Sequence, residues 1–229
     1  MDRFFQGTSI SNIGGAFLLK EQIDFDLWGQ VINTCIEQND SIRLRLKLID
    51  EKPVQYVSEH KNRVFKLIDF TGKTKEEQDF WMNENMRTPF DIIDSDLFEI
   101  YFIKSWDGEQ GNSFRIHHII GDAWTISLLA TQTMENYKRL KEGSFIDGER
   151  KPSYLDYMKS EQDYLNSPKF LIDREYWSER FKDKPNLISI KLKDKDYYSS
   201  NANCKTYFVE GKQADAIRQY CEENATSPA

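Results

Sequence analysis

The stretch that decides the fold lies near the middle of the chain and reads Phe114-Arg115-Ile116-His117-His118-Ile119-Ile120-Gly121-Asp122-Ala123-Trp124. In a strand, neighbouring side chains point to opposite faces. Phe114, Ile116 and His118 therefore share one face, and Arg115 and His117 share the other. We expect His118 to continue the apolar face, where desolvation favours a neutral imidazole that can accept or hold a proton. At most one of the two histidines can then serve a given cavity.

The end of this stretch predicts a turn followed by a helix. Gly121 supplies the turn, and Asp122 can cap a helix over residues 122–140. A purely structural reading is open at this point, because a lone buried histidine is more often structural than catalytic. A metal site has less support, since adjacent histidines on a strand diverge and His60, the third histidine, is distant in sequence.

Outward from this centre, apolar periodicity alternates between strands and helices. Strands are predicted over residues 12–20, 42–48, 54–57, 64–68, 97–106, 112–118 and 206–209. Helices are predicted from a cap at Asp26 through residue 36, and over residues 71–86, 122–140, 152–181 with a break near Ser167-Pro168, and 213–223. Residues 185–200, which are polar and rich in lysine, are expected to be a crossing segment. The pattern predicts an α+β fold with a mixed sheet and flanking helices.

Composition excludes several classes of protein. The chain has 229 residues and a formal net charge of −7, which disfavours binding to nucleic acid or to an anionic membrane surface. No apolar run approaches the roughly 20 residues of a membrane span, and the first residues lack the core of a signal peptide. Its three cysteines, Cys35, Cys204 and Cys221, form no C-x-x-C pair and are expected to be reduced thiols. We therefore expect a soluble cytoplasmic protein.

The segment from His117 to Trp124 resembles the H-H-x-x-x-D-G motif of the condensation domains of nonribosomal peptide synthetases. Four of the five fixed positions match, and Ala123 stands where the motif has glycine. Other segments are similar to the family in the same order, namely residues 13–19, residues 38–46 with Arg43, Tyr154-Leu155-Asp156-Tyr157, and Tyr176-Trp177. The resemblance implies a chloramphenicol-acetyltransferase-like two-layer sandwich, of which this chain is the first of two lobes.

Roles for individual residues follow from the resemblance alone. His118 is implied to be the reactive histidine, acting either as a general base toward an amine or as a hydrogen-bonding positioner. Asp122 is implied to be structural and to pair with an arginine, for which Arg43 is the positional match. His117 and Gly121 are implied to support the same turn.

The resemblance also implies the substrates and partners. An acyl or peptidyl thioester on one carrier protein would be joined to the amine of an aminoacyl thioester on another, both held on phosphopantetheine arms. The partners are then carrier domains and the rest of the synthetase. No cofactor or metal on this chain, no nucleic acid and no membrane is expected.

The position of the motif predicts the domain organisation. Because 111 residues follow His118, we expect a first lobe over residues 1–181, a crossing linker over 182–202, and the beginning of a second lobe over 203–229. This chain alone is expected to be inactive.

Two other functions compete with peptide-bond formation. One is a stand-alone acyltransferase that uses coenzyme A or a carrier thioester and builds its site between protomers. The other is a noncatalytic condensation-like domain that recruits partners, against which the presence of His118 argues. Within the family, a starter domain is one option, heterocyclising relatives use aspartates in place of the histidines, and epimerising relatives share the motif.

Overall fold

The structure is a computed structural model that describes residues 7–144, 151–183 and 207–227. It divides the chain into two units, Met1–Pro185 and Asn186–Ala229. Each unit is described by itself. The expected crossing segment, residues 185–200, lies outside the described residues.

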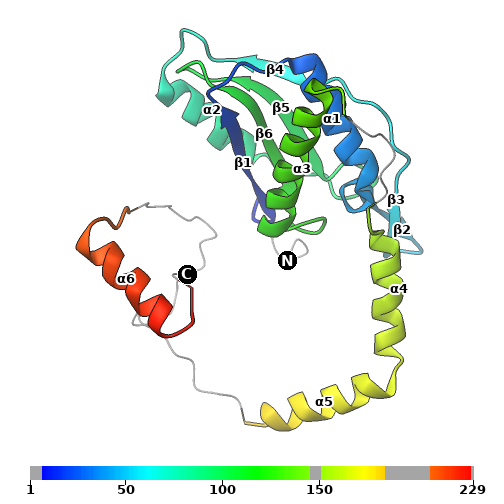
Figure 1. Cartoon of the computed structure of the whole chain (residues 1–229). Helices are drawn as coiled ribbons and strands as arrows, with labels where there is room; N and C mark the ends of the chain where they lie inside the picture. Colours follow the sequence, from blue (N-terminus) through cyan, green and yellow to red (C-terminus); the bar gives the residue numbers. More distant parts are fainter. Residues whose placement is uncertain (1–6, 145–150, 184–206, 228–229) are drawn as a thin grey trace. The chain divides into compact units, whose positions relative to one another are not determined.

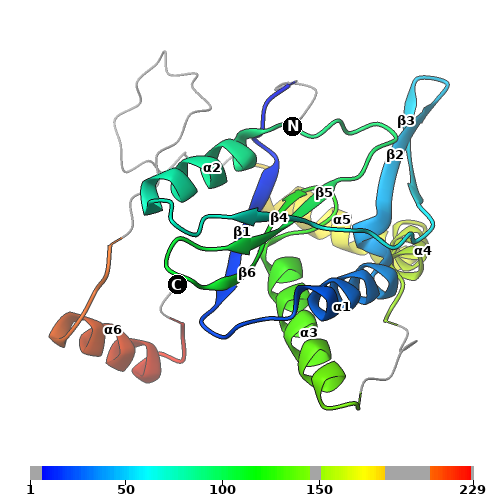
Figure 2. The ribbon, with the colours of Figure 1, turned by 90° about the horizontal axis from the view of Figure 1, so that it is seen from above.

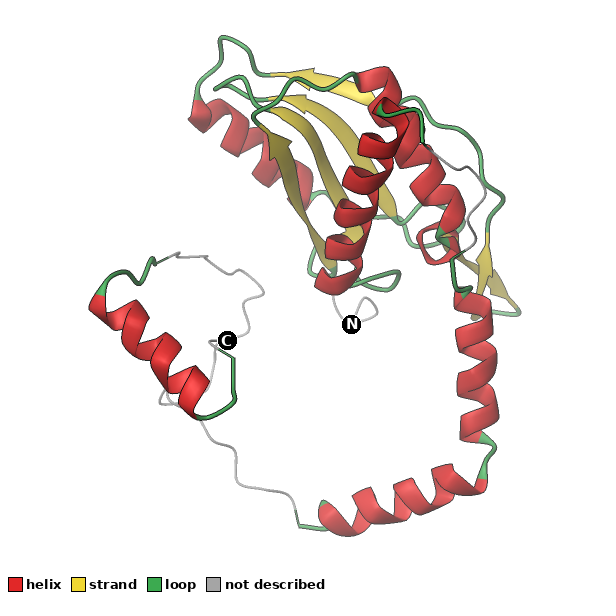
Figure 3. Ribbon diagram, in the orientation of Figure 1, coloured by secondary structure: helices red, strands yellow, loops and turns green. Residues whose placement is uncertain are grey.

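A four-stranded mixed sheet is the centre of the first unit (Figures 1 and 3). Its strands lie in the order β1 (Asn12–Leu19), β6 (Gln110–His117), β5 (Phe98–Lys104) and β4 (Lys66–Asp69). The first three are antiparallel to their neighbours, whereas β4 runs parallel to β5. The mixed sheet predicted from the sequence is confirmed.

Three helices pack on this sheet (Figure 2). α1 (Phe25–Gln38) and α3 (Ala123–Lys141) cover one face, and α2 (Lys75–Arg87) crosses the other. α1 begins after Asp24, whose carboxylate accepts hydrogen bonds from the amides of Asp26 and Leu27. The predicted cap at Asp26 is therefore wrong by two residues, because Asp24 alone has the extended backbone that a cap requires.

The hydrophobic core lies between the sheet and the pair α1 and α3. Trp28 is completely buried there and donates a hydrogen bond from Nε1 to Asn112 Oδ1 on β6, at 3.1 Å. The other buried members of this core are mainly aliphatic and come from α1, the start of β2 and the sheet: Val31, Ile32, Cys35, Ile36, Ile42, Leu44, Leu97, Phe98, Phe102, Ile116 and Ile120. The apolar stripe predicted for residues 27–36 is thus the face that α1 buries.

A separate hairpin follows α1. A 3₁₀ turn (Asp40–Arg43) leads into β2 (Leu44–Ile49), which pairs antiparallel with β3 (Lys52–Val57). Asp50 and Glu51 both have positive φ, 49° and 61°, as a tight hairpin turn requires. The predicted strand over 42–48 therefore loses its first two residues to the 3₁₀ turn.

The remaining helices are α4 (Tyr154–Leu165), α5 (Pro168–Arg180) and, in the second unit, α6 (Lys212–Glu223). α4 and α5 are separated at Ser167, whose side chain caps α5, so the predicted break is confirmed. The predicted strand over 206–209 is wrong for its described part, residues 207–209, because no described segment of that unit pairs with it. Of the helices described, none is long and apolar enough to cross a membrane.

Candidate active site

His118 lies in the turn that follows β6. The strand ends at His117, which pairs with Asn12 of β1, and the chain then turns through residues 118–120. The His118 amide donates to the carbonyl of Ser11 at 2.7 Å, and the Ile120 amide donates to the carbonyl of His117 at 3.0 Å. The side chain of His118 is exposed. Its predicted burial on the apolar face is wrong, because the alternation of faces stops where the strand stops.

His117 occupies the opposite face, as predicted, and is 4% exposed. Its Nδ1 accepts a hydrogen bond from the amide of Ile119 at 3.1 Å, so this nitrogen acts as an acceptor and carries no proton. The ring of Phe90 meets the imidazole edge-on, with 6.3 Å between centroids. His117 therefore holds the backbone of the turn from which His118 projects.

Gly121 closes the turn by fitting into a narrow space. A Cβ atom at this position would lie 2.8 Å from Thr125 Cγ2 and 3.1 Å from Ile116 Cδ1. Its φ is not positive. The expectation that Gly121 supplies a left-handed turn is therefore wrong, and close packing is what requires the glycine.

Asp122 caps α3, as predicted. Its Oδ1 accepts from the Thr125 amide at 2.9 Å and from the Thr125 hydroxyl at 3.0 Å. These hydrogen bonds, the backbone one first, lower the pKa of the Asp122 carboxyl. Ala123 is the first residue of α3 and has no positive φ, so alanine meets no strain there.

Arg43 does not pair with Asp122, and this prediction is wrong. Its guanidinium donates to three backbone carbonyls: Nη1 to Ser58 at 2.7 Å, Nε to Ile36 at 3.2 Å, and Nη2 to Glu37 at 3.2 Å. The last carbonyls of a helix have no partner within the helix. Because Arg43 lies in the 3₁₀ turn just after α1, its side chain satisfies those carbonyls instead of reaching α3.

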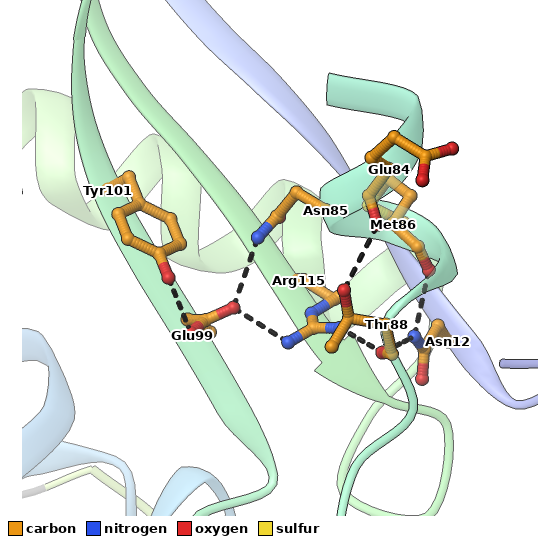
Figure 4. A network of polar contacts seen from close by, with 8 residues as sticks. All are labelled: Asn12, Glu84, Asn85, Met86, Thr88, Glu99, Tyr101 and Arg115. Atoms are coloured by element: carbon orange, nitrogen blue, oxygen red, sulfur yellow. Dashed lines mark hydrogen bonds and ion pairs between the residues drawn. The ribbon is translucent and has the colours of Figure 1, made fainter. Parts of the chain in front are cut away.

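A buried polar network on the α2 side of the sheet was not anticipated from the sequence (Figure 4). Arg115, two residues before His117, is 4% exposed, and its Nη2 lies 2.7 Å from Glu99 Oε2. The signal in the sequence was a charged residue inside an otherwise apolar strand, because a buried charge requires a partner. The sequence does not show which of the acidic residues provides it.

An apolar cavity of about 70 Å³ lies on the other face, between the sheet and the helices α1 and α3. Ile116 and Ile126, which flank the turn, line it together with Cys35. Burial raises the pKa of the Cys35 thiol, against the opposing effect of its hydrogen bonds with Thr133 and Asn136. Within residues 7–144, 151–183 and 207–227, no group of three or more histidine, cysteine or acidic side chains is placed to hold a metal ion.

The family follows from comparison with known proteins. The model of the condensation domain matches residues 1–228, almost the whole chain. The chain belongs to the condensation-domain family. The resemblance noted around His117 and His118 is thereby confirmed at the level of the family.

Two relatives from Bacillus subtilis (strain 168) are peptide synthetases. Surfactin synthase subunit 1 is 31% identical over 231 residues, which cover 99% of this chain and 6% of that protein. The matching polypeptide of plipastatin synthase is 28% identical and covers 95% of this chain and 9% of that protein. The chain thus spans less than a tenth of the length of either relative.

Solved structures show the same fold. The first condensation domain of the calcium-dependent antibiotic synthetase, in complex with a substrate analogue, superposes with a TM-score of 0.78 at 17% identity, covering 99% of this chain and 55% of that one. The starter condensation domain of the rhizomide synthetase RzmA gives 0.74 at 19% identity, covering 81% of this chain and 45% of that one. The fold is therefore chloramphenicol-acetyltransferase-like, as expected, and this chain corresponds to about half of each of these chains.

Proposed function

We propose that this chain supplies the histidine-bearing half of a condensation domain that forms an amide bond between two carrier-bound substrates. The observation that carries this proposal is the exposed side chain of His118, presented on a turn whose backbone is fixed by His117 and whose end is capped by Asp122. A reactive group needs both access to its substrate and a fixed position. His118 combines the two.

The reaction joins an amine to a thioester. The nitrogen of the aminoacyl group attacks the thioester carbonyl carbon, a C–N bond forms, the C–S bond breaks, and the thiol of the donor arm leaves. One proton is lost from the attacking nitrogen, and the departing sulfur takes up one proton. His118 either accepts the amine proton or holds the amine by a hydrogen bond, and holding both arms in place supplies much of the rate in each case.

Carrier proteins bearing phosphopantetheine are the partners that this reaction requires. The arms belong to those partners, so no cofactor is assigned to the present chain. We place the protein in the cytoplasm, and the free thiols of Cys35 and Cys221 support this location.

The proposed domain organisation is a first lobe over residues 1–181, a linker over 182–202 and the start of a second lobe over 203–229. Coverage of about half of the solved condensation domains supports it. α5 also leaves large apolar side chains exposed, which fits their burial by a second lobe. They are Leu171, Ile172, Tyr176, Trp177 and Phe181.

The test is a reconstituted reaction with the synthetase that carries this chain. One carrier is loaded with an acyl thioester, another with an aminoacyl thioester, and the amide product is detected by mass spectrometry. We expect product only when both carriers are loaded. Equal turnover with acyl-coenzyme A and a free amine would instead favour a stand-alone acyltransferase, and no turnover with either substrate pair would favour a recruitment domain.

A further inference from the structure

We propose that Arg115 is a positioning residue for the turn that carries His118, acting through Phe90 and His117. This inference rests on the proposed function, because it assigns a role toward the same histidine. Arg115 lies on the sheet face opposite to α1 and α3, so its side chain acts from behind the turn.

The first step is the anchoring of Arg115 itself. Its Nη2 binds Glu99 Oε2 at 2.7 Å, and its Nη1 donates to the carbonyl of Thr88. Glu99 is held in turn by Tyr101, whose hydroxyl donates to Oε1 at 2.7 Å, and by Asn85, whose Nδ2 donates to Oε2 at 3.2 Å. The guanidinium therefore has a fixed position among strongly bound neighbours (Figure 4).

The second step is the attachment of the segment that follows α2. Asn12, the β1 partner of His117, donates from Nδ2 to the carbonyls of Met86 and Thr88, both at 2.8 Å. The Thr88 carbonyl thus receives hydrogen bonds from both Asn12 and Arg115 (Figure 4). These bonds fasten the end of α2 to the two strands that meet at the turn.

The third step runs through Phe90. The Arg115 guanidinium carbon lies 4.4 Å from the centroid of the Phe90 ring, in a cation–π contact. The same ring meets His117 edge-on at 6.3 Å. Phe90 therefore touches the arginine on one side and the imidazole on the other, and it transmits the position of one to the other.

The last step is the hydrogen bond from the Ile119 amide to His117 Nδ1, at 3.1 Å. This bond fixes the backbone directly after His118. A displacement of the His117 ring changes the backbone from which the His118 side chain projects. The geometry thus links a buried ion pair to the exposed reactive group.

The experiment compares Arg115→Met, which keeps the length of the side chain but removes its charge, with the conservative Arg115→Lys. The matched control is Gln78→Met. Gln78 lies near the other end of α2, where its Oε1 accepts from the Ser105 hydroxyl at 2.9 Å and from the Trp106 amide at 3.0 Å. The control variant removes a buried polar contact between the same helix and the sheet, away from the turn.

Two readouts are measured. In the 229-residue chain, NMR records the ¹⁵N shifts of the His117 imidazole and the hydrogen exchange of the Ile119 amide. In the synthetase, kcat and KM of amide formation are determined. We expect Arg115→Met to speed Ile119 exchange at least about tenfold and to lower kcat roughly 10- to 100-fold at constant KM. Arg115→Lys should restore part of both, and Gln78→Met should change neither.

Unchanged Ile119 exchange and kcat in Arg115→Met would overturn the proposal, as would equal changes in Gln78→Met. If Arg115→Met does not fold, Phe90→Leu decides, because it removes the ring and keeps the Arg115–Glu99 pair. The NMR result is independent of catalysis. A lost Ile119 signature together with full activity of a His118→Ala variant would uphold the effect of Arg115 on the turn and reject the proposed function instead.

Discussion

At the scale of single residues, the position of His118 depends on one step in the backbone. Asn12 and His117 form the last pair between β1 and β6, and the next residue already belongs to the turn. If the ladder extended one residue further, His118 would lie on the core-facing side of the sheet. The end of the ladder therefore exposes the histidine, while the residue before it stays buried.

Gly121 gives the first prediction at this scale. Gly121→Ala should lower the free energy of unfolding by about 1–3 kcal/mol, because the added methyl group overlaps Thr125 and Ile116. Gly15→Ala on β1 is the control, since a Cβ there meets nothing within 4 Å. Urea denaturation measures both variants. Equal stability of the two would show that packing does not select the glycine.

Tyr101 gives the second. Burial and the hydrogen bond to the Glu99 carboxylate raise the pKa of Tyr101 to about 12. The neutral phenol therefore stabilises the fold below about pH 10, the ordinary value, and this contribution is lost as the pH rises toward 12. In Glu99→Gln the negative charge is gone, so the Tyr101 pKa should fall. An NMR titration of the Tyr101 ring measures it, with Tyr101→Phe to assign the signal, and an unchanged midpoint would contradict the role of Glu99.

At the scale of elements, ion pairs join segments that hydrogen-bonded strand ladders do not. Asp96, just before β5, binds Arg45 of β2 at 2.5 Å and Arg63 of the segment before β4 at 2.7 Å. Arg63 also lies over the ring of Phe98, 4.7 Å from its centroid. The hairpin and the edge of the sheet are thereby tied together near the end where the turn lies.

Asp96→Asn should reduce the free energy of unfolding by about 2 kcal/mol at neutral pH, because it weakens charged hydrogen bonds to both arginines. Burial is the largest single influence on the Asp96 carboxyl and raises its pKa, but the hydrogen bonds and charges of Arg63 and Arg45 together outweigh it and lower the pKa. The ionised form thus stabilises the fold above about pH 4, and the contribution is lost as the pH falls through the lowered value.

The measurement is urea denaturation between about pH 7 and pH 3. The difference between the original chain and Asp96→Asn should shrink as the pH falls. Asp50→Asn, in the exposed hairpin turn, should stay within about 0.5 kcal/mol throughout. A constant difference for Asp96→Asn at every pH would show that the charge of Asp96 is not what stabilises this contact.

Sequence patterns predicted most elements, because periodicity reports which faces are buried. The stripe through Trp28 and the α3 cap at Asp122 are examples. Periodicity does not report where a ladder ends, so it misplaced His118. It also does not report which distant group satisfies a side chain. Arg43 met the open carbonyls of α1, and Arg115 met Glu99, neither of which the local pattern indicates.

At the scale of the whole molecule, the chain corresponds to about half of the solved condensation domains. We expect the purified 229-residue chain to form no amide from two loaded carriers, because the proposed second lobe would supply the rest of the site. The synthetase that carries the chain serves as the positive control in the same assay. Turnover by the isolated chain would show that this lobe is dispensable.

The central claim is that His118 on this turn carries the reaction, and single-turnover amide formation in the synthetase tests it most directly. His118→Ala is compared with His60→Ala, the same substitution at a histidine whose contact is with Asn62. We predict that His118→Ala lowers the rate at least about 100-fold while His60→Ala retains it. An unchanged rate in His118→Ala would contradict the account.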